Sequence, residues 1–463
     1  MMEISQKEEG VFDAKYRALT IGIILAVTTV AFEGLAIVTI APSLAQKLNG
    51  LHLYGWIFSS FLLAQILGTM IMGQRINKHG VFASFGLSIL FFVIGIVIAA
   101  TALNMFMLII GRVFQGFGAG AVITCVYYSI TLGYPDNLRT KILALFSSAY
   151  ILPALIGPYI AGFIAEHLSW RIVFWLVLPF IALAVVLTLP AFRRLTVRRD
   201  TASKNSRKEG YAVLLAIGTG LLLVGLSFIT QWKGMILSVT GLIIMIQPIR
   251  KLLPEGTLSA RRGLPATIAS RGFFVASYNA TESYVVLALT DVKMLPADLA
   301  GLIVAAGAIS WSTAAWLQSK LDVKDNGNGR KNRVSVGIGF MIIGVAMVML
   351  AVGLPDGGII FAVMSQLFTG FGIGLAHPTT GAIALKNAKA GEEGDISASL
   401  QFTDAFGPSL SIGLGGALIG VSQSLNFGLL TGILLALFLQ FLFVLMSFII
   451  SFRIKQARFS EGN

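Results

Sequence analysis

One glycine-rich segment occurs twice in the sequence, and this repeat constrains the fold more than any other feature. Residues 112–120 read RVFQGFGAG and residues 366–374 read QLFTGFGIG, a separation of 254 residues. The same separation carries Ala161-Gly162 onto Gly415-Gly416, so two neighbouring segments share it. One half of the chain is therefore related to the other, a construction typical of membrane proteins with two similar helical bundles around a central site.

Composition indicates that the repeat lies in a membrane. Hydrophobic residues make up 56% of the chain, charged residues only 12%, and the mean hydropathy is +0.84, values that exclude a soluble domain. The net charge of +13 lies in short strips between apolar segments of about 20 residues, so it indicates loops and no nucleic-acid partner. The single cysteine, Cys125, excludes an intrachain disulfide. The first apolar stretch is too long for a signal-peptide core, so we expect a retained span.

The apolar segments predict an all-α polytopic membrane protein with about 14 spans, arranged as six, two and six. The expected spans lie near residues 18–42, 54–73, 83–103, 106–133, 139–165, 170–192, 211–229, 234–249, 265–289, 298–318, 333–353, 358–387, 396–420 and 425–452. Residues 1–192 are expected to form an N-terminal six-helix bundle and residues 264–463 a C-terminal one. Residues 193–263 hold a polar linker and an inserted helix pair without a counterpart in the repeat, which is expected to be peripheral.

Positive charge orients these spans. An even number of spans puts both termini on one side, and nearly all of the 34 lysines and arginines then fall on that side. Four basic residues fall on the opposite side, namely Lys47, Arg171, Lys233 and Lys293. Because short loops rich in positive charge stay in the cytoplasm, we expect cytoplasmic termini and a multi-pass protein of the plasma membrane.

Two predicted spans carry motifs of small residues. In the fourth span, an intramembrane arginine precedes a glutamine and three glycines: Arg112, Gln115, Gly116, Gly118 and Gly120. The fifth span carries a Gly-Pro motif made of Pro153, Gly157, Pro158, Ala161 and Gly162. Small residues at this spacing let two helix backbones approach closely, and Pro158 removes one backbone donor and bends the helix. Tight packing alone also accounts for such a face.

Two further segments belong to the same set of motifs. Glu33 follows an apolar residue in the first span and precedes a proline by nine positions. The loop after the second span reads GQRINKHG, with Gly73, Asn77, Lys78 and the turn glycine Gly80.

Together these segments resemble the major facilitator superfamily, in particular its 14-span drug/proton antiporter branch, over essentially the whole chain. Glu33 stands where this branch usually has aspartate, and the loop from Gly73 to Gly80 resembles the family's cytoplasmic gate loop. Asn77 stands where that loop has an acid, so the resemblance implies that its charge network is weakened or rebuilt. The resemblance implies two pseudo-symmetric six-helix bundles plus two inserted helices, no cofactor or metal, and a monomer. It also implies proton-coupled export of small amphipathic or drug-like compounds by alternating access. An uptake symporter, or an exporter of one narrow class of metabolite, in the same superfamily is the alternative.

Ionisable side chains inside the spans are the candidate coupling residues, because each costs roughly 2.5–3.5 kcal/mol at a helix centre. Glu33 lies midway along the first span, where burial favours its neutral form, and it is the first candidate proton carrier. Glu282 lies deep in the ninth span, where it can carry a proton or bind a cation. Asp404 lies in the cytoplasmic third of the thirteenth span, where it can also face loop water.

Three basic groups also lie inside predicted spans. Arg112 is expected to neutralise ionised Glu33 and to release it when substrate or a proton arrives, while an arginine reaching for the outer interface is the alternative. His377, which precedes a proline, is expected to be a hydrogen-bonded packing histidine beside a kink rather than a proton relay. Arg271 is close enough to the cytoplasmic end to reach the interface, so we expect it outside the site.

Aromatic residues supply candidates for the wall of a substrate cavity. These are Tyr127, Tyr128, Tyr150, Trp311, Trp316 and Phe406. Aromatic faces attract cations and offer large contact areas without fixed hydrogen-bond geometry, which suits selection among varied compounds. Because core packing and lipid contact also use such residues, we expect only some of the six in the cavity.

Other function classes lack their signatures in this sequence. It contains no GxxxxGK[ST] phosphate loop of an ATP-driven pump, and its four histidines have no metal-ligand spacing, which argues against an enzyme. No polar strip is long enough for a soluble signalling domain. The sequence therefore predicts a secondary transporter whose partners are a small-molecule substrate, protons and the lipid bilayer.

Overall fold

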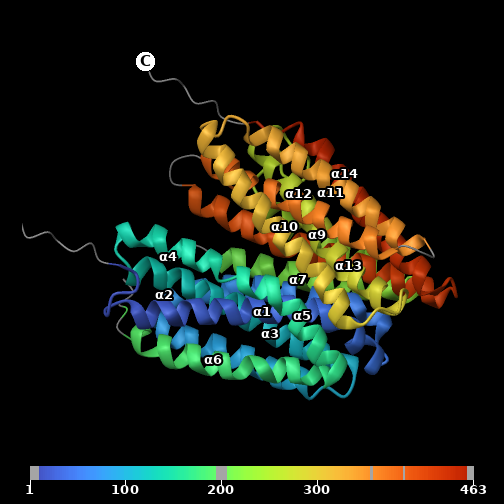
Figure 1. The fold of residues 1–463 in the computed structure, drawn as a ribbon, viewed down its shortest axis with the longest axis horizontal. Coiled ribbons are helices and arrows are strands. Elements are labelled where there is room, and N and C mark those ends of the chain that lie inside the picture. The colour runs from blue at the N-terminus through green and yellow to red at the C-terminus, as the bar shows by residue number, and fades with distance from the viewer. Residues whose placement is uncertain (1–9, 194, 196–205, 355–357, 389–391, 456–463) are drawn as a thin grey trace, which may run out of the picture.

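The computed structural model of the chain describes residues 10–193, 195, 206–354, 358–388 and 392–455, and these contain helices but no strands (Figure 1). The helices are α1 (Arg17–Lys47), η1 (Leu51–Leu53), α2 (Tyr54–Ala100), α3 (Met105–Gly133), α4 (Asp136–Ser148), α5 (Ile151–His167), α6 (Trp170–Phe192), α7 (Ser206–Ser227), α8 (Trp232–Leu252), α9 (Leu264–Asp291), α10 (Ala297–Lys324), α11 (Arg330–Gly353), α12 (Gly358–Lys386), α13 (Glu393–Ser424) and α14 (Gly428–Ser451). Within the described ranges, 11 helical segments are long and apolar enough to cross a membrane. The predicted all-α polytopic membrane fold is confirmed.

The two spans expected near residues 54–73 and 83–103 belong to one long helical element, α2, which is broken at Gly80. Gly80 has φ 81° and ψ 167°, a backbone conformation that is essentially restricted to glycine. The chain therefore reverses between two spans without a long loop, and the turn residue must lack a Cβ atom.

The span expected near residues 139–165 is divided into α4 and α5. The break at Ala149 and Tyr150 lies one turn before Pro153, which has no N–H to donate to the carbonyl of Ala149. The hydroxyl of Thr28 in α1 donates to this carbonyl instead, at 3.2 Å. The prediction of one span here was wrong: α4 carries charged residues at its start, among them Arg139 and Lys141, and of the two helices only α5 is apolar over most of its length.

The glycine repeat makes equivalent contacts in the two halves. A Cβ atom at Gly116 or Gly120 of α3 would collide with the backbone of α2. A Cβ atom at Gly370 or Gly374 of α12 would collide with the backbone of α10 in the same way. The repeated sequence therefore produces the same close helix pair twice, as expected for small residues at a membrane helix interface.

Helices α1–α6 form one half of the molecule, in the lower part of Figure 1, and helices α9–α14 form the other half, in the upper part. The halves meet through α2 against α13 and α5 against α10. In the first pair, the hydroxyls of Ser59 and Ser409 each donate to the carbonyl of the other residue, at 2.7 and 3.2 Å. At the far ends of α1 and α9, Gln46 donates a hydrogen bond to Asp291. We call these contacts the joint; they lie toward the helix ends opposite the two chain termini.

The inserted pair is not simply peripheral, which corrects the sequence-based expectation for α7. Helix α7 packs on α2 of the first half and on α13 of the second, where Leu215 and Phe406 share one buried cluster. Helix α8 packs on α7 and exposes large apolar side chains, among them Ile236 and Ile243. The apolar surface available on both halves draws α7 inward, and α8 lies outside it.

Candidate functional site

The two ionisable residues predicted for the first bundle lie in contact. Arg112 of α3 forms an ion pair with Glu33 of α1 through Nη1 and Oε1, and both side chains are buried. The Arg112 Nε donates to the carbonyl of Ile57, and Nη1 donates to Oε1 of Gln115, both at 3.0 Å. The guanidinium also lies 4.2 Å from the ring centre of Phe61. This arginine points into the bundle and does not reach for the outer interface.

The hydrogen bonding of this pair is incomplete on the acid side. Among the described residues, no group bonds to Glu33 Oε2 or to Gln115 Nε2, although both atoms are buried. A buried ion pair offsets its desolvation cost only when the remaining polar atoms are also satisfied. Glu33 therefore keeps one carboxylate oxygen on which a proton can bind without displacing an existing hydrogen bond.

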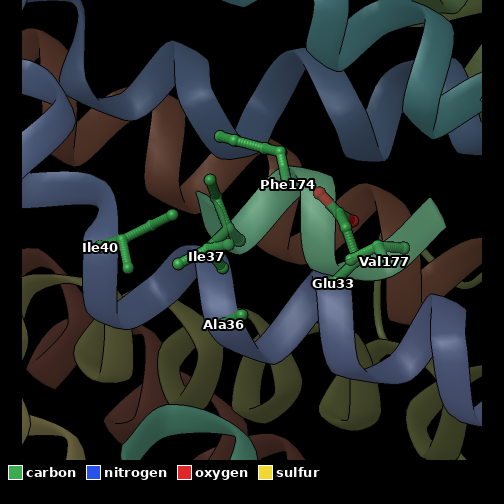
Figure 2. A pocket seen from close by; sticks show the side chains of 7 residues that line it. Glu33, Ala36, Ile37, Ile40, Phe174 and Val177 are labelled. Atoms are coloured by element: carbon green, nitrogen blue, oxygen red, sulfur yellow. The ribbon is translucent and has the colours of Figure 1, made fainter. Parts of the chain in front are cut away.

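The carboxyl group of Glu33 lies in an apolar seam between α1 and α6. Figure 2 shows Glu33 on one helix with its side chain beside the facing helix that carries Phe174 and Val177. The seam is lined by Glu33, Ala36, Ile37, Ile40, Val173, Phe174 and Val177, and it is too narrow for a water molecule. Apart from Arg112 and its partners, the acid is surrounded by hydrocarbon.

The Gly-Pro motif of α5 lies at the joint between the two halves. Gly162 of α5 fits against the backbone of Ala297, and Gly301 of α10 fits against the carbonyl of Pro158. The rest of the motif faces the first bundle: Gly157 lies beside the ring of Phe32, Ala161 is buried, and Pro153 follows the break before α5. The small residues thus permit close packing between halves as well as within one.

A charge network lies in the loop between α10 and α11 of the second half, which follows the second helix of that half as the segment from Gly73 to Gly80 follows the second span of the first. Between α10 and α11, Arg330 pairs with Asp322 at 2.5 Å, and Arg333 pairs with Asp322 at 2.7 Å and with Asp325 at 2.5 Å. The hydrogen bond from Arg333 lowers the pKa of Asp325, which lies in the loop itself. This network was not predicted from the sequence, although two acids and two arginines surround a glycine-containing turn there.

A second charged cluster lies in the second half and joins three helices. Arg271 of α9 donates two hydrogen bonds to Asp404 of α13, from Nε to Oδ1 at 2.8 Å and from Nη2 to Oδ2 at 2.7 Å. Its Nη1 donates to the carbonyl of His377 of α12 at 2.7 Å, and its Nη2 lies 2.6 Å from His377 Nε2. His377 Nε2 is also 3.3 Å from Asp404 Oδ2. We call Arg271, His377 and Asp404 the three-helix cluster.

This cluster differs from the sequence-based expectation for Arg271. Its side chain does not reach for the interface, because it is buried and its guanidinium binds α12 and α13. His377 is hydrogen-bonded, as expected, and its partners are the two charged members of the cluster. The signal available in the sequence was three ionisable residues at similar depths in the spans of one half. Depth alone does not show which way each helix turns its side chains.

Glu282 lies apart from the other predicted coupling residues. It is buried on α9, and within the described part of the chain no side chain forms an ion pair or hydrogen bond with it. Tyr278, one turn earlier on α9, packs edge-on against Trp311 at 5.2 Å, and Trp311 packs against His377 at 5.9 Å. These rings lie between the unpaired acid and the three-helix cluster.

The candidate cavity aromatics fall into different environments. Trp311 belongs to the row of rings just described, and Tyr127 and Tyr150 both contact Phe146 of α4. Trp316 is 59% exposed near the end of α10, where Lys320 covers its ring. The remaining two are packing residues: Tyr128 lies against the first-half core, and Phe406 stacks on Phe402 beside α7.

Comparison with known proteins adds a family and a set of relatives. The sequence profile of the Major Facilitator Superfamily matches residues 21–412. The multidrug efflux pump SdrM of Staphylococcus aureus is 27% identical over 44% of this chain and 46% of its own length. Multidrug resistance protein 3 of Bacillus subtilis is 21% identical over 86% of this chain and 78% of its own. The MFS-type transporter pydD of Acremonium is 31% identical over 50% and 41%. The matches to the first relatives span about half of those proteins' length.

Solved structures show the same fold. An auto-inhibited peptide transporter of the POT family superposes with a TM-score of 0.70 at 15% identity, covering 96% of this chain and 99% of its own. A point mutant of the nucleoside transporter NupG superposes with a TM-score of 0.64 at 13% identity, covering 94% and 98%. At these identities the likeness concerns the fold alone.

Proposed function

Because the chain belongs to the major facilitator superfamily, we propose that it exports small amphipathic or drug-like molecules in exchange for protons. The family consists of transporters rather than enzymes, and its members carry small molecules through a membrane. Relatives named for multidrug efflux, multidrug resistance or multidrug transport support the export of varied compounds. The observation that carries the proposal is the buried ion pair between Glu33 and Arg112.

Proton coupling follows from what the first bundle does when Glu33 changes charge. The carboxylate neutralises Arg112, whose other contacts, to Ile57, Gln115 and Phe61, are all uncharged. A proton on Glu33 removes the only opposite charge that pairs with Arg112 in the described structure, so the guanidinium is left buried and uncompensated. The bundle then favours an arrangement in which Arg112 gains water or another anion. Protonation thus shifts the balance between two conformations.

Substrate competes with this proton in the proposed cycle. A cationic compound that approaches Glu33 or the unpaired Glu282 stabilises the ionised acid, and a proton stabilises the neutral one. The rings of Tyr278 and Trp311 beside Glu282 offer faces that attract a lipophilic cation. Mutual exclusion of proton and substrate gives antiport, because each leaves the site on the side where the other enters.

Alternating access requires that the joint opens and closes. Many of its contacts are made by glycine backbones and serine hydroxyls, which separate readily. Tyr54 of α2, whose hydroxyl donates to the carbonyl of Ser283 of α9 at 2.8 Å, must also withdraw when the halves part. In the proposed topology both termini face the cytoplasm, the protein resides in the plasma membrane as a monomer, and the joint seals the outer side. The moving units are residues 1–192 and 264–463, with residues 193–263 between them.

Transport of a cationic dye by purified protein in liposomes with an imposed pH gradient tests this proposal. We expect gradient-driven dye movement for the wild type, loss of this movement in Glu33→Gln, and its retention in Glu255→Gln, which removes an exposed loop acid. If the wild type moves no dye under any gradient, multidrug export is refuted. An uptake symporter or an exporter of one class of metabolite then takes its place.

A further inference from the structure

One nitrogen atom in the three-helix cluster lies between a group that can only donate and a group that can only accept. His377 Nε2 is 2.6 Å from Arg271 Nη2 and 3.3 Å from Asp404 Oδ2. A guanidinium has no acceptor, and an ionised carboxylate has no donor. The same nitrogen therefore cannot satisfy both partners in one protonation state.

The close contact with Arg271 identifies the state of the imidazole in this conformation. Because Arg271 donates, His377 Nε2 accepts through its lone pair, so the neutral ring carries its hydrogen on Nδ1. In this state neither His377 Nε2 nor Asp404 Oδ2 carries a hydrogen. The two acceptors therefore repel each other across 3.3 Å. A hydrogen on Nε2 reverses both relationships, because it removes the lone pair used by Arg271 and gives Asp404 a donor.

We propose that His377 is a second proton-binding site, in which an incoming proton transfers the imidazole from Arg271 to Asp404. The added proton binds the Nε2 lone pair, the hydrogen bond from Arg271 Nη2 is lost, and Nε2–H donates to Asp404 Oδ2. No covalent bond other than N–H changes. The carboxylate is then shared between a guanidinium and an imidazolium, which weakens its hold on Arg271. The inference rests on the proposed proton coupling and adds a second proton-binding site to it.

The surroundings allow a proton to reach His377 and limit which other groups respond with it. The side chains of His377 and Asp404 are 29% and 28% exposed, whereas that of Arg271 is 6% exposed. Helix α9 also presents Tyr278 and Glu282 further along the same face, and α10 presents the ring of Trp311. Helix α11 packs on α12 through glycine contacts at Gly337 and Gly344. Arg271 and Asp404 are the charged groups that contact the imidazole.

Helix α13 connects this site to the joint. Pro408 lies four residues after Asp404 and has no N–H to donate to the Asp404 carbonyl, so the helix is weakened at this turn. Ser409, the next residue, bonds to Ser59 of the other half. Loosening of Arg271 from Asp404 thus acts on the helix segment just before the contact that holds the halves together.

Tryptophan fluorescence tests the site without substrate or membrane gradient. A protonated imidazole quenches an adjacent indole, and Trp311 lies 5.9 Å from His377. The signal of Trp311 is the difference in emission between the full-length wild type and Trp311→Phe, titrated in detergent from about pH 8 to about pH 5. We expect the Trp311 emission of the wild type to fall in one transition as pH is lowered. This transition should be absent in His377→Gln and present in His79→Gln.

Two results overturn the proposal: a Trp311 signal that is flat across this range in the wild type, or one that titrates unchanged in His377→Gln. Asp404→Asn provides a second variant, since loss of the acceptor should move the transition to lower pH, and an unmoved transition contradicts the transfer to Asp404. Failure of dye transport with an intact titration refutes the proposed function but not this site. Transport with no titration refutes the site alone.

Discussion

Arg112 and Glu33 form an ion pair between α3 and α1 in which the two side chains are 1% and 2% exposed. A pair so deeply buried contributes little net stability, because desolvation offsets the attraction, but removal of one partner strands the other charge. The pair therefore responds strongly to a proton or a ligand. This asymmetry underlies the first prediction.

Arg112→Gln should destabilise the protein by about 3–5 kcal/mol if Glu33 stays ionised, because an unpaired carboxylate remains in the apolar seam. Adding Glu33→Gln should restore much of the loss, since the double variant buries no charge. Unfolding of the single and double variants in detergent measures this coupling. Additive losses in the double variant would show that the two side chains act independently.

A disulfide across the joint should stop transport. In a Cys125→Ser background, Ser59→Cys and Ser409→Cys place two thiols where each native hydroxyl reaches the backbone of the other residue. Oxidation should cross-link the pair, abolish dye movement, and allow full recovery after reduction, because the halves must separate there. Each single cysteine variant is the control. Undiminished transport by fully cross-linked protein would mean that the joint does not open.

The loop network between α10 and α11 should stabilise the protein in a pH-dependent manner. Arg333 lowers the pKa of Asp325 below its unfolded value, so this contribution is fully present above about pH 4 and disappears as pH falls through the folded pKa. Asp325→Asn should therefore lower the unfolding temperature at pH 7, and the difference from the wild type should shrink below about pH 4. Glu255→Gln serves as control. A difference that is constant with pH would argue against an ionic origin.

The break between α4 and α5 should depend on Thr28 only while Pro153 is present. Thr28→Val leaves the Ala149 carbonyl without its donor and should cost about 1–3 kcal/mol. Pro153→Ala restores an N–H that can bond to that carbonyl, so Thr28→Val should be nearly silent in this background. The free energies of unfolding of the wild type, the two single variants and the double variant check this. Equal costs in both backgrounds would assign the effect of Thr28 to something other than this carbonyl.

Several parts of the fold could be predicted from the sequence because the bilayer fixes the length of each span and the backbone fixes what a special residue can do. Gly80 was expected at a turn, and its positive φ explains why glycine is required there. The repeated glycine motif indicated two related halves, and the matching contacts of α3 and α12 follow from the absence of side chains. The division before Pro153 and the inward position of α7 were missed, because apolar character alone does not reveal either.

The sequence by itself determined the all-helical membrane fold, the relation between the halves, and which ionisable residues lie inside apolar segments. It also suggested that Arg112 neutralises Glu33. Only the tertiary structure decided that Arg271 turns toward α12 and α13, and that Glu282 has no ionic partner among the described residues. The position of a residue within an apolar segment indicates its depth in the membrane, whereas the neighbours that its side chain meets depend on packing against helices distant in the chain.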